Sequence, residues 1–227
     1  MKKDRVYEEV LDFITKAELE AIENVNDAVS FVTYVRKWAM DRELHLEPFN
    51  PHSLCKNLVE EQVEATEAAQ MYLDSMFADA EDDPQEAVKA YMDAIVDGVI
   101  YATVDTVRTH PDWKPANLNA DNVGIIPLSA LMSPVLPFIS HVPPELRVLA
   151  LATELRYYVE TPFTSVIQEV LKEITSRRGE FSADMGKWVK DPTKPTYKAD
   201  FQFDPDYVSA LWQQLDRLPF EERSDAS

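Results

Sequence analysis

Two stretches decide the fold of this chain: Asn57-Leu-Val-Glu60-Glu61-Gln-Val-Glu64-Ala-Thr-Glu67 and Tyr91-Met-Asp93-Ala-Ile-Val-Asp97-Gly-Val-Ile-Tyr101. Both have the spacing of apolar residues that predicts a helix. Separations of three and four residues place Glu64 on a shared helix face with Glu60 and with Glu61. Asp93 and Asp97 share a face in the same way, inside an almost unbroken apolar run where an unpaired carboxylate is costly to bury.

These acids need a counter-charge, and the second stretch does not supply one. No basic residue occurs in 91–107, so the cation must come from elsewhere. Two such helices packed face to face would offer four or five carboxylates to one site. An all-oxygen, anionic site suits Mg²⁺ or Mn²⁺ and does not suit zinc. The alternative for the first stretch is a solvated acidic helix face, which is the commoner origin of such a pattern.

At these residues the sequence resembles a known family, the all-α nucleoside triphosphate pyrophosphohydrolases. These form the MazG-like and phosphoribosyl-ATP-pyrophosphohydrolase-like superfamily, and the phage-type members are the most similar. The family signature is EExxE on one helix and an acid pair ending in Asp on a later helix. The matching residues here are Glu60, Glu61, Glu64 and Asp97. The usual second motif is ExxD, but Ala94 stands where its Glu is expected, and Asp93 is the candidate replacement.

The resemblance resumes near the C-terminus. The segment 166–177 takes the place of a family helix that ends S-N-M-S-K, with Ile174 at the Asn position and Arg177 keeping the terminal base. The segment 186–201 then resembles the phage-type ending G-K-v-x-K-p-p-t-Y-x-P-P-D-f. We expect Lys187 and Lys190 to lie on one side of an extended strand, where they would suit phosphate binding. The alternative is a basic surface strand.

The resemblance implies hydrolysis of the α-β phosphoanhydride of a nucleoside triphosphate, giving a monophosphate and pyrophosphate. It implies Mg²⁺ or Mn²⁺ as cofactor and a homodimer or homotetramer. The residues it nominates as metal ligands are Glu60, Glu61, Glu64, Asp93 and Asp97. Glu60 and Glu61 are the catalytic candidates, and Glu60 is left open between ligand and general base for water. The candidates for contacting the substrate phosphates are Arg177, Lys187, Lys190 and Tyr197.

Composition narrows the class of protein. A net charge of −19 opposes duplex nucleic acid as a partner, because phosphate binding needs Lys and Arg. Only four glycines occur in 227 residues, which argues against a glycine-rich phosphate loop. Cys55 is the single cysteine, so neither an internal disulfide nor a cysteine-based zinc site is expected. We find no signal peptide or membrane span and expect a cytoplasmic protein, of phage or housekeeping origin.

We expect an all-α helical bundle in three parts. An N-terminal helical arm at 1–24 precedes one domain at 25–203, and a short helix and tail follow at 204–227. A helix at 4–23 would form the arm, either as an appendage or as an oligomer contact. The domain contains a Pro-rich insertion at about 110–161. Its principal helices are expected from Ser53, as N-cap, to about Phe77, and at 85–109.

Two rival functions belong to other classes. One is a catalytically inactive acidic helical protein of the same fold, which binds a partner through the 110–161 insertion. Ala94 and Ile174 favour this rival, because they replace family residues. The other is a helical scaffold whose negative charge imitates nucleic acid toward a basic partner. Glu61→Gln discriminates them, since it should abolish turnover in the enzyme and leave either rival intact.

Overall fold

The computed structural model describes residues 9–26, 28–75, 84–114 and 163–200. Within these ranges the chain is mostly helical with one small two-stranded sheet, which confirms the predicted all-α fold. The helices are α2 (Lys16–Glu23), α3 (Ala28–Asp41), the 3₁₀-helix η1 (Leu44–Leu46), α4 (Pro51–Ser75), α5 (Pro84–Thr109) and α9 (Phe163–Ser176); the strands are β1 (Gly179–Ser182) and β2 (Lys187–Lys190). None of these helices is both long enough and apolar enough to cross a membrane.

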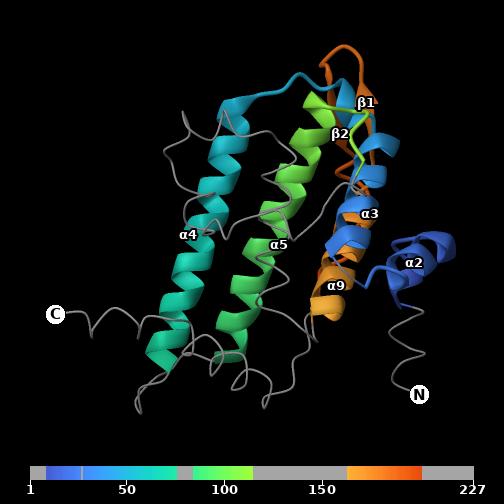
Figure 1. Ribbon diagram of the computed structural model, residues 1–227. Helices are drawn as coiled ribbons and strands as arrows, with labels where there is room; N and C mark the ends of the chain where they lie inside the picture. The colour runs from blue at the N-terminus through green and yellow to red at the C-terminus, as the bar shows by residue number, and fades with distance from the viewer. Residues whose placement is uncertain (1–8, 27, 76–83, 115–162, 201–227) are drawn as a thin grey trace.

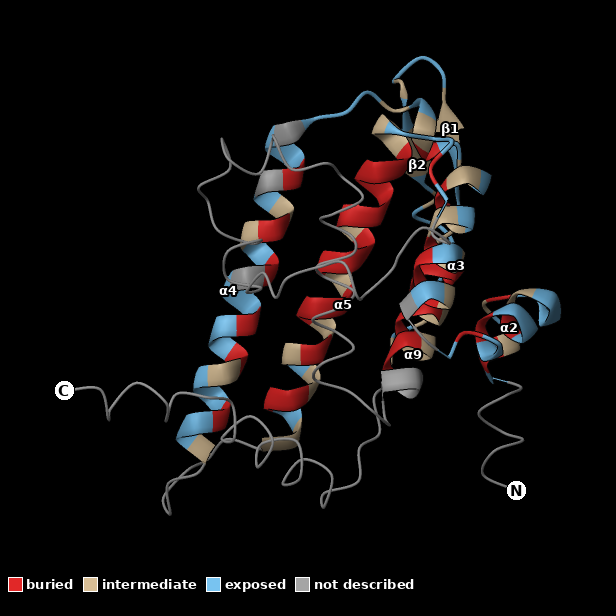
Figure 2. Cartoon of the chain, in the orientation of Figure 1, coloured by how far each residue is buried: buried red, intermediate tan, exposed pale blue. Residues whose placement is uncertain are grey.

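The two long helices, α4 and α5, pack against one another over their length (Figure 1). Helix α5 is central, because it also contacts α3, η1 and α9. Figure 2 shows buried residues running along almost all of α5, whereas α4 is buried on one side and exposed on the other. The predicted apolar wrap of the 85–109 helix is therefore confirmed, and its start and end lie within one residue of the prediction.

Helix α4 begins earlier than predicted. The side-chain oxygen Oδ1 of Asn50 accepts hydrogen bonds from the backbone N–H groups of His52 at 3.0 Å and Ser53 at 3.3 Å. Asn50 therefore caps the helix, and the expectation that Ser53 is the N-cap is wrong. Pro51 then takes the first helical position, where its missing N–H removes no hydrogen bond.

The N-terminal segment is not the single helix expected at 4–23. The chain turns at residues 12–14, and Thr15 caps a new helix, α2. The Thr15 hydroxyl accepts from the Glu18 N–H at 3.2 Å, and the Glu18 carboxylate accepts from the Thr15 N–H at 2.7 Å. The two side chains thus bond backbone N–H groups that have no partner at the start of a helix. This capping box explains why a new helix begins after Thr15. Leu19 and Ile22 of α2 are buried in the common core.

The hairpin that follows α9 pairs β1 with β2 in antiparallel register, Gly179 opposite Lys190 and Ser182 opposite Lys187. Gly179 is required by close packing, since a Cβ there would lie 2.2 Å from the Val189 carbonyl oxygen. The expectation that Lys187 and Lys190 lie on one side of the strand is wrong. Residues three apart in a strand point to opposite faces, because side chains alternate with a period of two.

Several expectations fall outside the described ranges. They are residues 115–161 of the predicted insertion, the end of the first acidic helix beyond residue 75, and the C-terminal helix and tail at 204–227. The first residues of the insertion are described. There, the guanidinium of Arg36 donates to the backbone oxygens of Pro111 and Trp113, both at 2.6 Å, and Trp113 is buried.

Candidate functional site: a carboxylate cluster between two helices

Acids from both predicted motifs face one another across the α4–α5 contact. Glu61 lies on the buried side of α4, and only 6% of the residue is exposed. Asp93 and Asp97 are partly buried on α5, while Glu60 and Glu64 of α4 are exposed. Together these five residues are called the carboxylate cluster below. All five predicted metal-ligand candidates thus lie on these two packed helices, and the other four act electrostatically on Glu61.

The other four acids of the cluster affect the pKa of Glu61. Burial and, in decreasing order, the charges of Asp97, Glu64, Asp93 and Glu60 together raise the pKa of Glu61 to about 8. Each carboxylate disfavours ionisation of the others, because like charges at short range repel in a partly desolvated site. A carboxyl group with this pKa holds its proton at neutral pH in the absence of a cation.

The two acids on α5 respond in the same way. Burial raises the pKa of Asp97 to about 7, with Asp93 as the strongest charged neighbour in the same direction. Burial, followed by Glu173 and Glu64, also raises the pKa of Asp93. Such shifted carboxyl groups in a cluster are typical of functional sites, although buried charge networks can also produce them.

Only one member of the carboxylate cluster has a bonded partner in the described part of the chain. Lys56 forms an exposed ion pair with Glu60 at 3.0 Å. Across the described ranges, no hydrogen bond or ion pair reaches the side chains of Glu61, Glu64, Asp93 or Asp97. Partial burial of the Glu61 carboxyl disfavours its ionised form, so a ligand that brings positive charge would stabilise that form.

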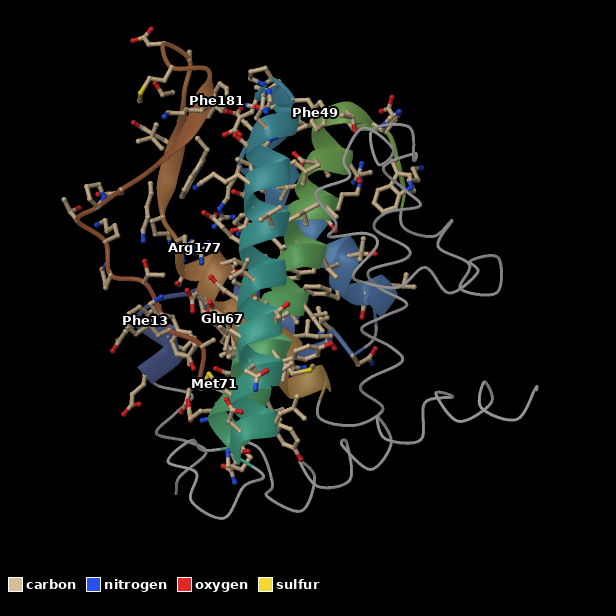
Figure 3. The ribbon with its side chains drawn as sticks, turned by 90° about the vertical axis from the view of Figure 1, so that its left-hand side faces the viewer. Phe13, Phe49, Glu67, Met71, Arg177 and Phe181 are labelled. Carbon is tan, nitrogen blue, oxygen red and sulfur yellow. The ribbon has the colours of Figure 1, made fainter. Side chains whose placement is uncertain are left out.

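A third helix, α9, brings charges of both signs to the cluster. Arg177, which follows α9, lowers the pKa of Asp97, and Glu173 raises it. Figure 3 shows Arg177 between the α4–α5 pair and the extended segment that follows the hairpin. Lys198 on that segment, with Arg177, lowers the pKa of Asp93. Arg177 was expected near the phosphates, whereas Glu173 and Lys198 were missed.

Tyr101 is a further residue that the sequence reasoning did not assign to the site. It lies one turn after Asp97 on α5, and burial together with the charges of Asp97 and Glu61 raises its pKa to about 12. Its hydroxyl therefore keeps its proton and remains a hydrogen-bond donor beside the carboxylates. The spacing of four from Asp97 was the available signal, since it places Tyr101 on the same helix face.

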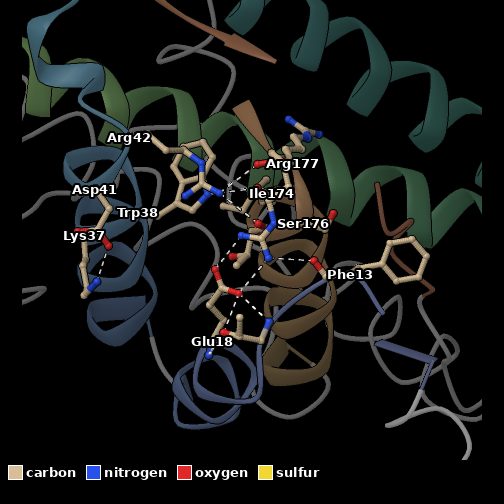
Figure 4. Close-up of polar contacts among 12 residues, drawn as sticks. Phe13, Glu18, Lys37, Trp38, Asp41, Arg42, Ile174, Ser176 and Arg177 are labelled. Carbon is tan, nitrogen blue, oxygen red and sulfur yellow. Dashed lines mark hydrogen bonds and ion pairs between the residues drawn. The ribbon is translucent and has the colours of Figure 1, made fainter. Parts of the chain in front are cut away.

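Trp38 of α3 and Arg42, which directly follows α3, hold the end of α9 that precedes Arg177 (Figure 4). The indole N–H of Trp38 donates to the Ile174 carbonyl at 3.2 Å. The guanidinium of Arg42 donates to the carbonyls of Thr175 and Arg177, both at 3.1 Å. These bonds satisfy carbonyls that a helix end leaves without partners, so they fix the backbone from which Arg177 projects.

The remaining phosphate-contact candidates are placed differently. The Tyr197 hydroxyl donates to the Glu169 carboxylate at 2.6 Å, and its ring packs edge-on against Phe13. Lys187 and Lys190 are exposed at the two ends of β2. Neither is among the groups that most affect the pKa values of Glu61, Asp93 or Asp97. The structure thus brings Arg177 to the cluster and leaves this role of the other three as a prediction.

The side chains of the carboxylate cluster suit a divalent cation in their chemical type but not in their present spacing. The donors are all carboxylate oxygens, which is the ligand type that Mg²⁺ and Mn²⁺ prefer. Glu61 is buried and has no counter-charge bonded to it among the described residues, so a cation would relieve the cost of ionising it. Within the described ranges, however, no three acidic, histidine or cysteine side chains lie close enough together to hold an ion as they stand.

Comparisons of the chain with protein-family models, curated proteins and solved structures give no match. The resemblance to the pyrophosphohydrolases therefore rests on the sequence motifs alone and stays a prediction.

Proposed function

We propose that the chain is a metal-dependent nucleoside triphosphate pyrophosphohydrolase, which cleaves the α-β phosphoanhydride of its substrate. The observation that carries this proposal is Glu61, a buried residue whose carboxyl has no bonded partner among the described residues and has Asp97 of the packed helix α5 as its strongest charged neighbour. A chain selected only for stability would gain by replacing such a group with an apolar residue. Retaining it is understandable if a ligand supplies positive charge.

The proposed roles follow from the position of each side chain. Glu61, Glu64, Asp93 and Asp97 would hold Mg²⁺ or Mn²⁺, which when bound neutralises the phosphate oxygens and acts as a Lewis acid. Glu60 is more exposed than Glu61 and has only a weak surface partner, so it is free to accept a proton from water. The hydroxyl of Tyr101 would donate a hydrogen bond within the cluster.

The two departures from the family motif bear on this proposal. Ala94 is buried on α5, so the position of the missing Glu now contributes to packing. Ile174 is buried in the common core, and its backbone carbonyl is bound by Trp38. An Asn at 174 would not reach a nucleotide from there. We propose that nucleotide selection depends on other residues, and assembly as a homodimer or homotetramer stays a prediction.

The test is release of pyrophosphate from a panel of ribo- and deoxynucleoside triphosphates with Mg²⁺ or Mn²⁺. Wild type is compared with Glu61→Gln and with a matched control, Glu67→Gln, which removes an exposed acid from the same helix. We expect Glu61→Gln to lose turnover and Mn²⁺ binding together, and Glu67→Gln to keep both. Turnover that needs no metal, or a folded wild type without activity on any nucleotide, would contradict the proposal and favour the partner-binding alternative.

A further inference from the structure

Glu173 is bonded to two basic side chains at the edge of the carboxylate cluster. Its Oε1 lies 3.2 Å from the Arg177 guanidinium and 3.2 Å from the Lys198 ammonium. Its other oxygen, Oε2, accepts a hydrogen bond from the Ala199 N–H at 3.0 Å. Glu173 therefore joins the end of α9 to the extended segment that follows the hairpin and sets the two bases side by side.

The backbone around Lys198 is fastened to α9 on both sides. The Tyr197 N–H donates to the Ser176 hydroxyl at 2.9 Å, and the Asp200 N–H donates to the Glu169 carboxylate at 3.2 Å. Arg177 is held through its carbonyl by Arg42. Both bases thus project from fixed backbone, although the Lys198 side chain itself is 83% exposed. A ligand can reach them without rearrangement of the fold.

The charges of this group do not balance. Two bases share one carboxylate, which leaves a surplus positive charge beside a protein of net charge −19. By contrast, in the nearby ion pairs Lys172–Glu169 and Arg178–Glu18, one base is paired with one acid. The surplus acts on the carboxylate cluster, because Arg177 and Lys198 both oppose the rise in the pKa of Asp93.

We propose that Arg177 and Lys198 form an anion-binding pair for the pyrophosphate end of the substrate, with Glu173 holding them until phosphate oxygens take its place. This inference rests on the proposed function and assigns to Lys198 the role that the sequence suggested for Lys187 and Lys190. Arg177 offers a planar fork that matches two phosphate oxygens, and Lys198 offers a mobile point charge. The Lys198 side chain is exposed, and ion pairs of exposed side chains contribute little to stability, so exchanging its contact with the Glu173 carboxylate for a contact with phosphate costs little.

The experiment uses inorganic pyrophosphate as the probe, with the full chain and Mg²⁺ present, and measures binding by calorimetry. Arg177→Gln and Lys198→Gln are compared with Lys194→Gln, which removes an exposed base from the same connecting segment. Loss of one charge-assisted contact should weaken pyrophosphate binding about 10-fold for Lys198→Gln and at least as much for Arg177→Gln. We expect Lys194→Gln to stay within about twofold of wild type, and Mn²⁺ binding to be retained in all three variants.

The outcomes separate the two proposals. Equal pyrophosphate binding by wild type and Lys198→Gln, in a protein that hydrolyses nucleotides, would overturn the anion-binding pair and leave the proposed function standing. Weakened binding in Lys198→Gln, by a wild type that turns over no nucleotide, would support the pair and reject the hydrolase. A wild type that binds no pyrophosphate would overturn the pair whatever its activity.

Discussion

Helix α5 carries buried acids in two different environments. Near its end, Asp105 accepts from the Arg108 guanidinium at 3.0 Å, and Arg108 also bonds to Glu47, which accepts from the Trp188 N–H at 2.7 Å. Two turns earlier, Asp97 has no hydrogen bond or ion pair within the described ranges. The same helix therefore holds one acid that is fully engaged by the fold and one that is not.

This difference suggests that Asp105 serves to stabilise the fold, whereas Asp97 serves a function. The Asp105 network joins α5, the end of η1 and β2, and removing Arg108 takes the cationic partner from both Asp105 and Glu47. Asp97 has no such ionic partner among the described residues, and burial and Asp93 disfavour its ionisation more than Arg177 favours it. We therefore expect substitutions at the two positions to have opposite signatures, in stability for one and in activity for the other.

The largest expected effect is on turnover. Asp97→Asn should lower pyrophosphate release at least about 100-fold, because it removes a proposed ligand, and should not destabilise the fold. Asp105→Asn is the matched change in the same helix and should lower stability while leaving turnover within a few-fold. Steady-state kinetics and urea denaturation of both variants make the measurement. Equal losses of turnover in the two variants would contradict the assignment of a functional role to Asp97 and a structural role to Asp105.

The second expected effect is on stability. Arg108→Leu leaves Glu47 and Asp105 without their shared partner, and should lower the free energy of unfolding by about 3 kcal/mol. Lys37→Leu breaks the exposed ion pair with Asp41 and should change the free energy of unfolding by less than about 0.5 kcal/mol. Denaturant unfolding compares the two. A loss at Arg108 as small as that at Lys37 would show that the network does not support the fold.

A smaller effect should appear in the pH dependence of stability. The pKa of Glu61 rises from 4.5 to about 8 and that of Asp97 from 3.8 to about 7, so the folded state binds these protons more tightly than the unfolded state. Their contribution is complete below the unfolded values and is lost as pH rises through the folded ones. The full shifts would amount to about 6 kcal/mol between pH 5 and 8, but solvent screens these partly exposed carboxyl groups, so we expect the free energy of unfolding of metal-free protein to fall by about 2 kcal/mol.

Two controls sharpen this prediction. Glu61→Gln should flatten the pH dependence, and Mg²⁺ should stabilise wild type more at pH 8 than at pH 5. Glu18 does not interfere, although burial opposes its ionisation, because Arg178 and Thr15 lower its pKa to about 2. Its contribution is present above the unfolded value and is lost only in acid. A wild-type stability that rises between pH 5 and 8 would contradict the prediction.

The smallest effect concerns the start of α4, which carries Glu61. Asn50→Ala removes the N-cap and should lower the free energy of unfolding by about 1 kcal/mol, whereas Ser53→Ala should leave it unchanged. The pH dependence of Asn50→Ala should match that of wild type, which separates general loss of stability from loss of the carboxylates. A larger loss of stability in Ser53→Ala than in Asn50→Ala would show that Ser53 is the N-cap, as the sequence predicted.

Much of the helical framework could be predicted from local sequence. The apolar period and Pro84 located α5 to within one residue, and the acid spacing identified both faces of the carboxylate cluster. The restart at Thr15 was missed, although the capping pair of Thr15 and Glu18 was visible in the sequence. The strand error at Lys187 and Lys190 came from treating a spacing of three as if it were two.

The sequence by itself determined that this is a helical protein with two acidic motifs on long helices, because helix faces and caps depend on neighbours within four residues. Tertiary structure alone decided which charges meet. Glu173 and Lys198 lie more than 75 residues after Asp97, and only the packing of α9 on α5 and the fastening of 197–200 to α9 bring them to the cluster. Pairing between distant charges depends on how helices pack, which local periodicity does not specify.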